Sequence, residues 1–133
     1  MQKRAVRSIT KSKYNSSTNP IFVGLGILPL EHLITETRAL LMHSIYHKYS
    51  PTALHNIWIT NETRSLNHDH NLRDGHHIYI PLARTEHVKR LTHFALPKTW
   101  NDLPDSKLNR NTTTFKIFLK NHLLTQLSNS LLE

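Results

Sequence analysis

The chain has 133 residues, with 17 lysines and arginines against nine aspartates and glutamates, and it contains no cysteine. The missing cysteine excludes disulfides, thiolate zinc sites and a cysteine nucleophile. The net charge of +8 favours a polyanionic partner, RNA or DNA before an anionic membrane surface, and no apolar run approaches the roughly 20 residues of a membrane span.

The first 14 residues predict a basic helix at the start of the chain. A short apolar edge, Val6 and Ile9 among them, runs between the positive charges, and residues 1–30 contain no acid. Such a surface can follow a phosphate backbone without reading its sequence, although a solvated helix face explains the same pattern. The candidate phosphate contacts here are Lys3, Arg4, Arg7, Lys11 and Lys13. No apolar signal core accompanies these charges, so we expect an intracellular protein, in the nucleus or the cytoplasm.

A long central helix is expected over about residues 30–49, where apolar side chains recur at helical spacing. Pro29 suits its first position, Glu31 is favoured there by the helix dipole, and Pro51 prevents its continuation. The stretch before it, YNSSTNPIFVGLGI, contains Pro20 and two glycines and is interpreted as turns.

The second half of the chain predicts short strands and a closing helix. In HIYIPLA, Ile78 and Ile80 alternate with polar neighbours, which indicates a strand that Pro81 pushes to an edge. The following apolar spacing of three fits a partner strand or a helix, and we expect a small β-hairpin over about 77–94. A helix follows over about 113–127. The predicted fold over 1–133 is one region, mainly α with that hairpin (α+β).

Catalytic constellations are sparse. The four aspartates form no adjacent pair, and three glycines provide no phosphate loop. A histidine-rich stretch offers one alternative, a metal-dependent nuclease, but its spacing matches no metal motif. Its members are His68, Asp69, His70, Asp74, His76 and His77. We therefore expect no catalytic residue, no bound metal and no cofactor on this chain.

The segment LPKTWNDLP sets Trp100 between two prolines. We expect Trp100 and Leu103 to anchor this connector on the core, since an indole buries a large area. A base-stacking platform is the functional alternative. Arg73, Lys89 and Arg90 would extend a nucleic-acid surface if the fold brought them near the basic start.

A series of segments in this order resembles the region that follows the reverse transcriptase in LINE-type, jockey-like non-LTR retrotransposon proteins. The family's basic QKRAIR helix, tyrosine, Thr-x-Pro-aromatic element and entry to a long helix match Gln2–Arg7, Tyr14, Thr18–Phe22 and Leu25–Leu30. HDHNLR, LPKTWNDLP and TTFKIFLKNHLL resemble its later His-x-x-Asn-x-Arg, Gly-Pro-Lys-x-Trp-Asn-x-Leu-Pro and closing helix elements. Leu96 replaces the usual glycine, and Leu72 a frequent threonine.

The resemblance implies a non-catalytic C-terminal fragment, after the thumb, of an RNA-directed DNA polymerase protein whose catalytic aspartates lie upstream. Its implied partners are an RNA or DNA backbone and, in a longer chain, the upstream reverse transcriptase domain. A decayed retroelement relic without activity is the second possibility. That relic would expose apolar faces made for upstream domains.

Overall fold

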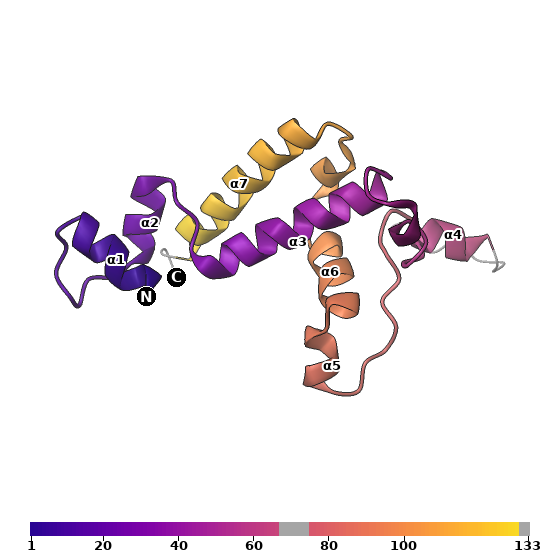
Figure 1. The fold of residues 1–133 in the computed structure, drawn as a ribbon, viewed down its shortest axis with the longest axis horizontal. Coiled ribbons are helices and arrows are strands. Elements are labelled where there is room, and N and C mark those ends of the chain that lie inside the picture. Colours follow the sequence, from indigo (N-terminus) through magenta and orange to yellow (C-terminus); the bar gives the residue numbers. More distant parts are fainter. Residues whose placement is uncertain (67–74, 131–133) are drawn as a thin grey trace. The chain divides into compact units, whose positions relative to one another are not determined.

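A computed structural model describes residues 1–66 and 75–130, and over these residues the chain is mainly helical, as expected (Figure 1). Its helices are α1 (Gln2–Ile9), α2 (Asn19–Leu25), α3 (Leu30–Tyr46), α4 (Asn61–Ser65), α5 (Glu86–Arg90), α6 (Thr92–Asn101) and α7 (Thr112–Asn129), with 3-10 turns η1 (Thr52–Leu54) and η2 (Asp105–Leu108). The chain divides into two compact units. We call Met1–Thr37 with Thr113–Glu133 the terminal unit, and Arg38–Thr112 the central unit.

The terminal unit is built on a small apolar cluster. Val6 of α1, Phe22 of α2 and Leu127 of α7 are buried together, and Ile21 and Val23 pack against them. These side chains come from distant parts of the sequence, so burying them brings α1, α2 and the end of α7 together. Burial of side chains this size is the dominant favourable term available to so small a core.

The turn-rich interpretation of residues 14–27 is wrong at α2. Pro20 sits in the first turn of this helix, and Gly26 ends it with a φ of 63°. The amide of Ile27 donates to the carbonyl of Phe22 at 3.0 Å, which is the closing bond of a Schellman motif. Proline just inside a helix and glycine just after it are boundary signals as well as turn signals.

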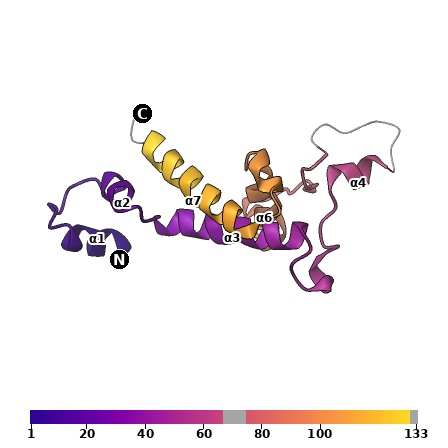
Figure 2. The same ribbon diagram turned by 90° about the horizontal axis from the view of Figure 1, so that it is seen from above.

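The long central helix is confirmed, and its end differs slightly from expectation. α3 ends at Tyr46, five residues before Pro51, because Lys48 adopts a φ of 62° and reverses the chain. The amide of Tyr49 donates to the carbonyl of Ser44 at 2.8 Å in a second Schellman motif. Figure 2 shows the irregular segment that then leads to α4.

The predicted β-hairpin over 77–94 is wrong, because the described residues contain no strand. One isolated antiparallel bridge joins Ile78 to Thr60, far earlier in the chain than the expected partner. The second half of the expected hairpin forms α5 and α6 instead (Figure 1). The Thr85 hydroxyl accepts a hydrogen bond from the amide of Val88, a helix cap that overrides the strand pattern.

Asn101 pairs with the backbone of Ile78 on the side of this segment opposite Thr60. Its side-chain oxygen accepts from the amide of Ile78, and its side-chain nitrogen donates to the carbonyl of Ile78, both at 2.8 Å. The carboxamide thus makes both bonds that a neighbouring strand would make. Ile78 is buried, and the segment it belongs to is held between residues 59–61 and the end of α6.

Pro97 lies inside α6, where it cannot donate to the carbonyl of His93 four residues earlier. The indole nitrogen of Trp58 donates to that carbonyl at 3.0 Å. Trp58 also stacks on the His93 ring, with centroids 5.9 Å apart. One of the two tryptophans therefore satisfies the acceptor that the proline leaves open.

α7 extends the closing helix expected over 113–127 by one residue at its start and two at its end. Its buried side chains follow helical spacing: Phe115, Leu119, Leu123 and Leu127. No helix within residues 1–66 and 75–130 is both long and apolar enough to cross a membrane.

Candidate nucleic-acid interface

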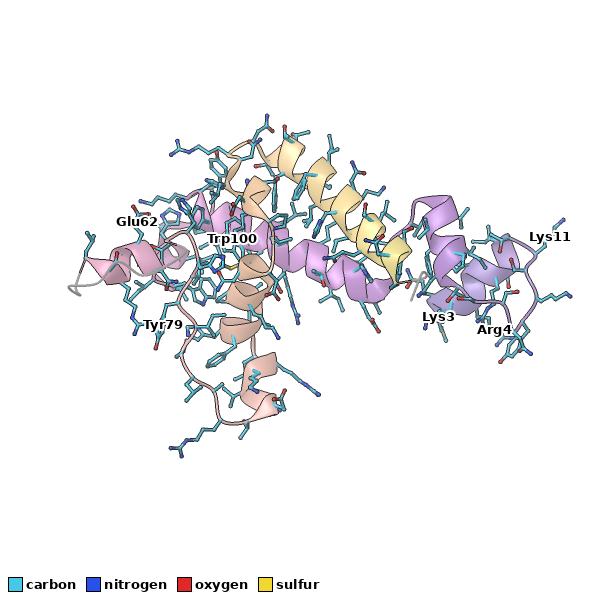
Figure 3. All side chains as sticks on the ribbon, turned by 180° about the vertical axis from the view of Figure 1, so that it is seen from behind. Lys3, Arg4, Lys11, Glu62, Tyr79 and Trp100 are labelled. Carbon is cyan, nitrogen blue, oxygen red and sulfur yellow. The ribbon has the colours of Figure 1, made fainter. Side chains whose placement is uncertain are left out.

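The basic start of the chain is held in place by two residues that carry no charge. The Gln2 side chain donates to the carbonyl of Leu28 at 3.3 Å and accepts from the amide of Leu30 at 2.8 Å, which caps the first turn of α3. Val6 is buried in the apolar cluster. With these residues facing inward, Lys3 and Arg4 are exposed (Figure 3).

Arg7 has a different environment from the other predicted contacts. It is half-buried, and its Nε donates to the carbonyl of Ser16 at 3.0 Å. Its guanidinium carbon lies 5.9 Å from the centre of the Tyr14 ring. Arg7 therefore organises the turn after α1, and replacing it would change the shape of the basic surface as well as its charge.

Lys11 and Lys13 lie beyond the end of α1, because the helix stops at Ile9 rather than reaching residue 14. The helix ends in a Schellman motif, with Ser12 donating to the carbonyl of Arg7 at 3.0 Å. Lys11 occupies the left-handed position, with a φ of 52°. This conformation costs an L-residue about 1 kcal/mol and costs glycine little. The turn presents both lysines to solvent.

The terminal unit thus carries four exposed cations, Lys3, Arg4, Lys11 and Lys13, on α1 and the turn that follows it. Figure 3 labels the first three of them. None of these cations is within ion-pair distance of a carboxylate among the described residues. An array of this kind neutralises successive phosphates and releases their counterions. Phosphate contacts of this kind carry no information about base sequence.

The remaining predicted contacts belong to the central unit or lie outside the described residues. Arg73 is in the latter group. Lys89 is ion-paired with Glu86 at 2.5 Å, and this partner lowers the pKa of the Glu86 carboxyl. Arg90 is exposed, and with Glu86, Lys89, Phe94 and Lys98 it lines an open cavity of about 580 Å³ whose other walls come from residues 79–83.

Trp100 is fully buried and Leu103 nearly so, in the interior of the central unit (Figure 3). The Trp100 ring lies 5.0 Å from that of Tyr46 and 6.4 Å from that of His43. In this position the indole has no face open for stacking on a base.

Lys107 is a buried cation that the sequence pattern did not single out. None of its surface is exposed, and its Nζ donates to the carbonyls of Trp100 and Leu103 at 2.9 Å and of Asn101 at 3.4 Å. It thereby satisfies acceptors at the carboxyl end of α6, where the helix dipole favours a positive charge. The only available signal was its place three residues after Pro104.

Of the histidine-rich stretch, only His76 and His77 fall within the described residues. His76 is exposed, with Nδ1 3.5 Å from the Tyr46 hydroxyl, and His77 is half-buried. Over residues 1–66 and 75–130, no three histidine or carboxylate side chains are grouped so as to hold a metal. The other members, residues 68–70 and 74, lie outside this part of the chain.

Comparisons with protein-family models, with curated proteins and with solved structures find no match for the chain. The resemblance to LINE-type retrotransposon proteins therefore rests on the sequence segments alone.

Proposed function

We propose that this chain is a non-catalytic, nucleic-acid-binding C-terminal fragment of a non-LTR retrotransposon reverse transcriptase protein. The four exposed cations of α1 and its turn contact backbone phosphates, and binding is independent of sequence. The observation that carries the proposal is this array, in a 30-residue stretch without a single acid. In a longer chain, the upstream reverse transcriptase domain is the protein partner, and the protein works in the nucleus or the cytoplasm.

Replacing Lys3 and Arg4 with alanine tests the proposed role of the basic array. Both are exposed, so replacing them with alanine removes two charges without removing the Gln2 and Val6 anchors. For single-stranded RNA each lost contact lowers affinity about fivefold at 0.1 M salt, so the double variant binds about 25-fold more weakly, whatever the RNA sequence. Fluorescence anisotropy with labelled RNAs of different sequence measures this.

A matched control uses Lys116 and Lys120 of α7, which are exposed and were not predicted as contacts. Their double alanine variant has the same net charge as the Lys3 and Arg4 variant. Equal weakening by the two variants would show attraction to the overall charge, and the proposed array would then be a solvated helix face.

A second candidate, the decayed relic, is favoured by a different observation. Leu30, Leu33, Ile34 and Leu41 are large apolar side chains of α3 that remain between 38% and 61% exposed. Faces of this kind match surfaces made for a domain the relic has lost. The relic predicts that the purified chain self-associates and melts without cooperativity. A monomer in sedimentation analysis with a sharp calorimetric transition would exclude it.

A further inference from the structure

A second cationic site lies in the central unit, at the carboxyl end of α3. A cavity of about 380 Å³ opens there. It is lined by Tyr46, His47, Lys48, His76, Leu108 and Arg110. Two of these residues carry a permanent positive charge, two are histidines, and no carboxylate is among the described residues that line the cavity. We call this cavity the α3-end cavity, and none of its lining residues belongs to the basic start of the chain.

Lys48 is held in a conformation that its residue type disfavours. Its φ of 62° places it in the left-handed region, at the turning position of a Schellman motif. At the equivalent position after α2 the chain has Gly26, with a φ of 63°. A lysine in this place gives up backbone stability that glycine would keep. Lys48 lines the α3-end cavity, so a binding role for its charge there would account for a lysine at this position.

The groups around His47 create a positive environment. Burial lowers the pKa of His47 first, the neighbouring His43 and Arg110 lower it further, and a hydrogen bond to the carbonyl of Lys107 opposes them. The His43 ring centre is 4.5 Å away, and the Tyr49 ring is stacked at 6.0 Å. Burial therefore does most to lower the pKa of His47, and His43 and Arg110 add to its effect.

Two features oppose an anion here. The carboxyl end of a helix carries partial negative charge, and Glu62 lies close enough to Tyr46 to raise the pKa of its hydroxyl, after burial. The first is weakened because backbone amides already occupy the last carbonyls of α3: those of His43, Ser44 and Ile45. Glu62 itself does not line the cavity.

We propose that this cavity binds a phosphate oxyanion. Lys48 and Arg110 supply the permanent charge, and Arg110 can make the bidentate contact that a guanidinium offers phosphate oxygens. His47 and His76 donate hydrogen bonds and bind more strongly when protonated, so affinity rises as the pH falls. The bound group is free phosphate, a phosphate monoester, or one phosphodiester of a nucleic-acid backbone.

The test is an NMR titration of the intact chain with inorganic phosphate and with pyrophosphate, following the His47 and His76 ring signals. Sodium chloride at equal ionic strength is the reference. We expect saturable shifts of both rings with phosphate, absent with chloride, and a rise in the pKa of His47 when the anion is bound. Shifts that never saturate, or that chloride reproduces, overturn the proposal.

Lys48→Gly is the decisive variant, because it removes the charge and relieves the left-handed conformation at once. Loss of one charge-assisted hydrogen bond should weaken pyrophosphate binding about tenfold. Lys116→Ala removes one exposed charge of α7 that belongs neither to this cavity nor to the basic array, so it should leave pyrophosphate binding unchanged. Equal effects of the two variants would show that only net charge matters and would overturn the site.

Two further arms assign the source of the phosphate. An oligonucleotide without terminal phosphates that displaces pyrophosphate would identify a backbone phosphodiester as the natural ligand. Displacement only by phosphate or by a phosphorylated end would identify a monoester or the free ion. The cavity shares no residue with the basic array, so this site can stand if RNA binding by that array fails.

Discussion

Replacing Lys107 with methionine should strongly destabilise the central unit. The substitution nearly keeps the side-chain volume, so little cavity is created. It removes the donor shared by three carbonyls, two of them at 2.9 Å. A hydrogen bond from a charged group contributes about 1.5–3 kcal/mol. We use the lower value, because the variant no longer has the cost of burying the ammonium. Two such bonds then predict a loss of about 3 kcal/mol in the free energy of unfolding.

Urea unfolding followed by tryptophan fluorescence measures this loss, since Trp58 and Trp100 both lie in the central unit. Lys98→Met is the control. Lys98 is an exposed lysine of α6, so its replacement should change the free energy of unfolding by less than about 0.5 kcal/mol. If Lys107→Met stayed within about 1 kcal/mol of the original chain, the buried ammonium would not be what holds this helix end.

Three further changes probe the same unit. Asn101→Ala removes both hydrogen bonds to Ile78 and should cost about 2 kcal/mol in urea unfolding, and a neutral result would mean the bridged segment is held without it. Trp58→Phe leaves the carbonyl of His93 without its indole donor and should lower stability by about 1–2 kcal/mol, measured by circular dichroism; no loss would mean that water serves equally well. The pKa of His47 lies below its ordinary 6.5, so protonation favours the unfolded chain and stability falls as the pH drops below about 6.5; His47→Gln should flatten this dependence, and an unchanged profile would assign it to another group.

Local patterns in the sequence predicted the two long helices, because each has an apolar face at helical spacing and a clear boundary. Both Pro51 and the threonines before Phe115 mark ends that the structure places within a few residues of the expectation. α2 was missed although its boundaries are just as explicit. Its seven residues are too few to show a helical period of apolar side chains. Without that period, Pro20 and Gly26 indicate turns as readily as helix ends.

The hairpin failed for a reason that lies outside the segment. The segment around Ile78 does form bridge hydrogen bonds, through His77 and Tyr79 to the backbone around Thr60, while Ile78 itself bonds the side chain of Asn101. Likewise, Pro97 is tolerated in a helix because Trp58, 39 positions earlier, supplies the missing donor. Hydrogen bonds of this kind join segments that are distant in sequence, so no pattern within a single segment predicts them.

The candidate nucleic-acid interface was likewise only partly predictable from the sequence. That residues 1–13 are basic follows from composition, and so does the proposal that they bind a polyanion. The separate role of Arg7 depends on the folded structure, in which its Nε donates to the carbonyl of Ser16. The left-handed turn at Lys11 likewise follows from the fold and not from composition. The α3-end cavity joins Lys48 to Arg110, 62 positions apart, and no local spacing relates them.

The salt dependence of RNA binding tests the central claim most directly. Fluorescence anisotropy of the intact chain with a single-stranded RNA of about 20 nucleotides gives the affinity between about 50 and about 200 mM NaCl. Four phosphate contacts predict a slope of about −3 for log affinity against log salt, which is a fall of about 50-fold over this range. A slope near zero, or no binding at the lowest salt, would contradict the account.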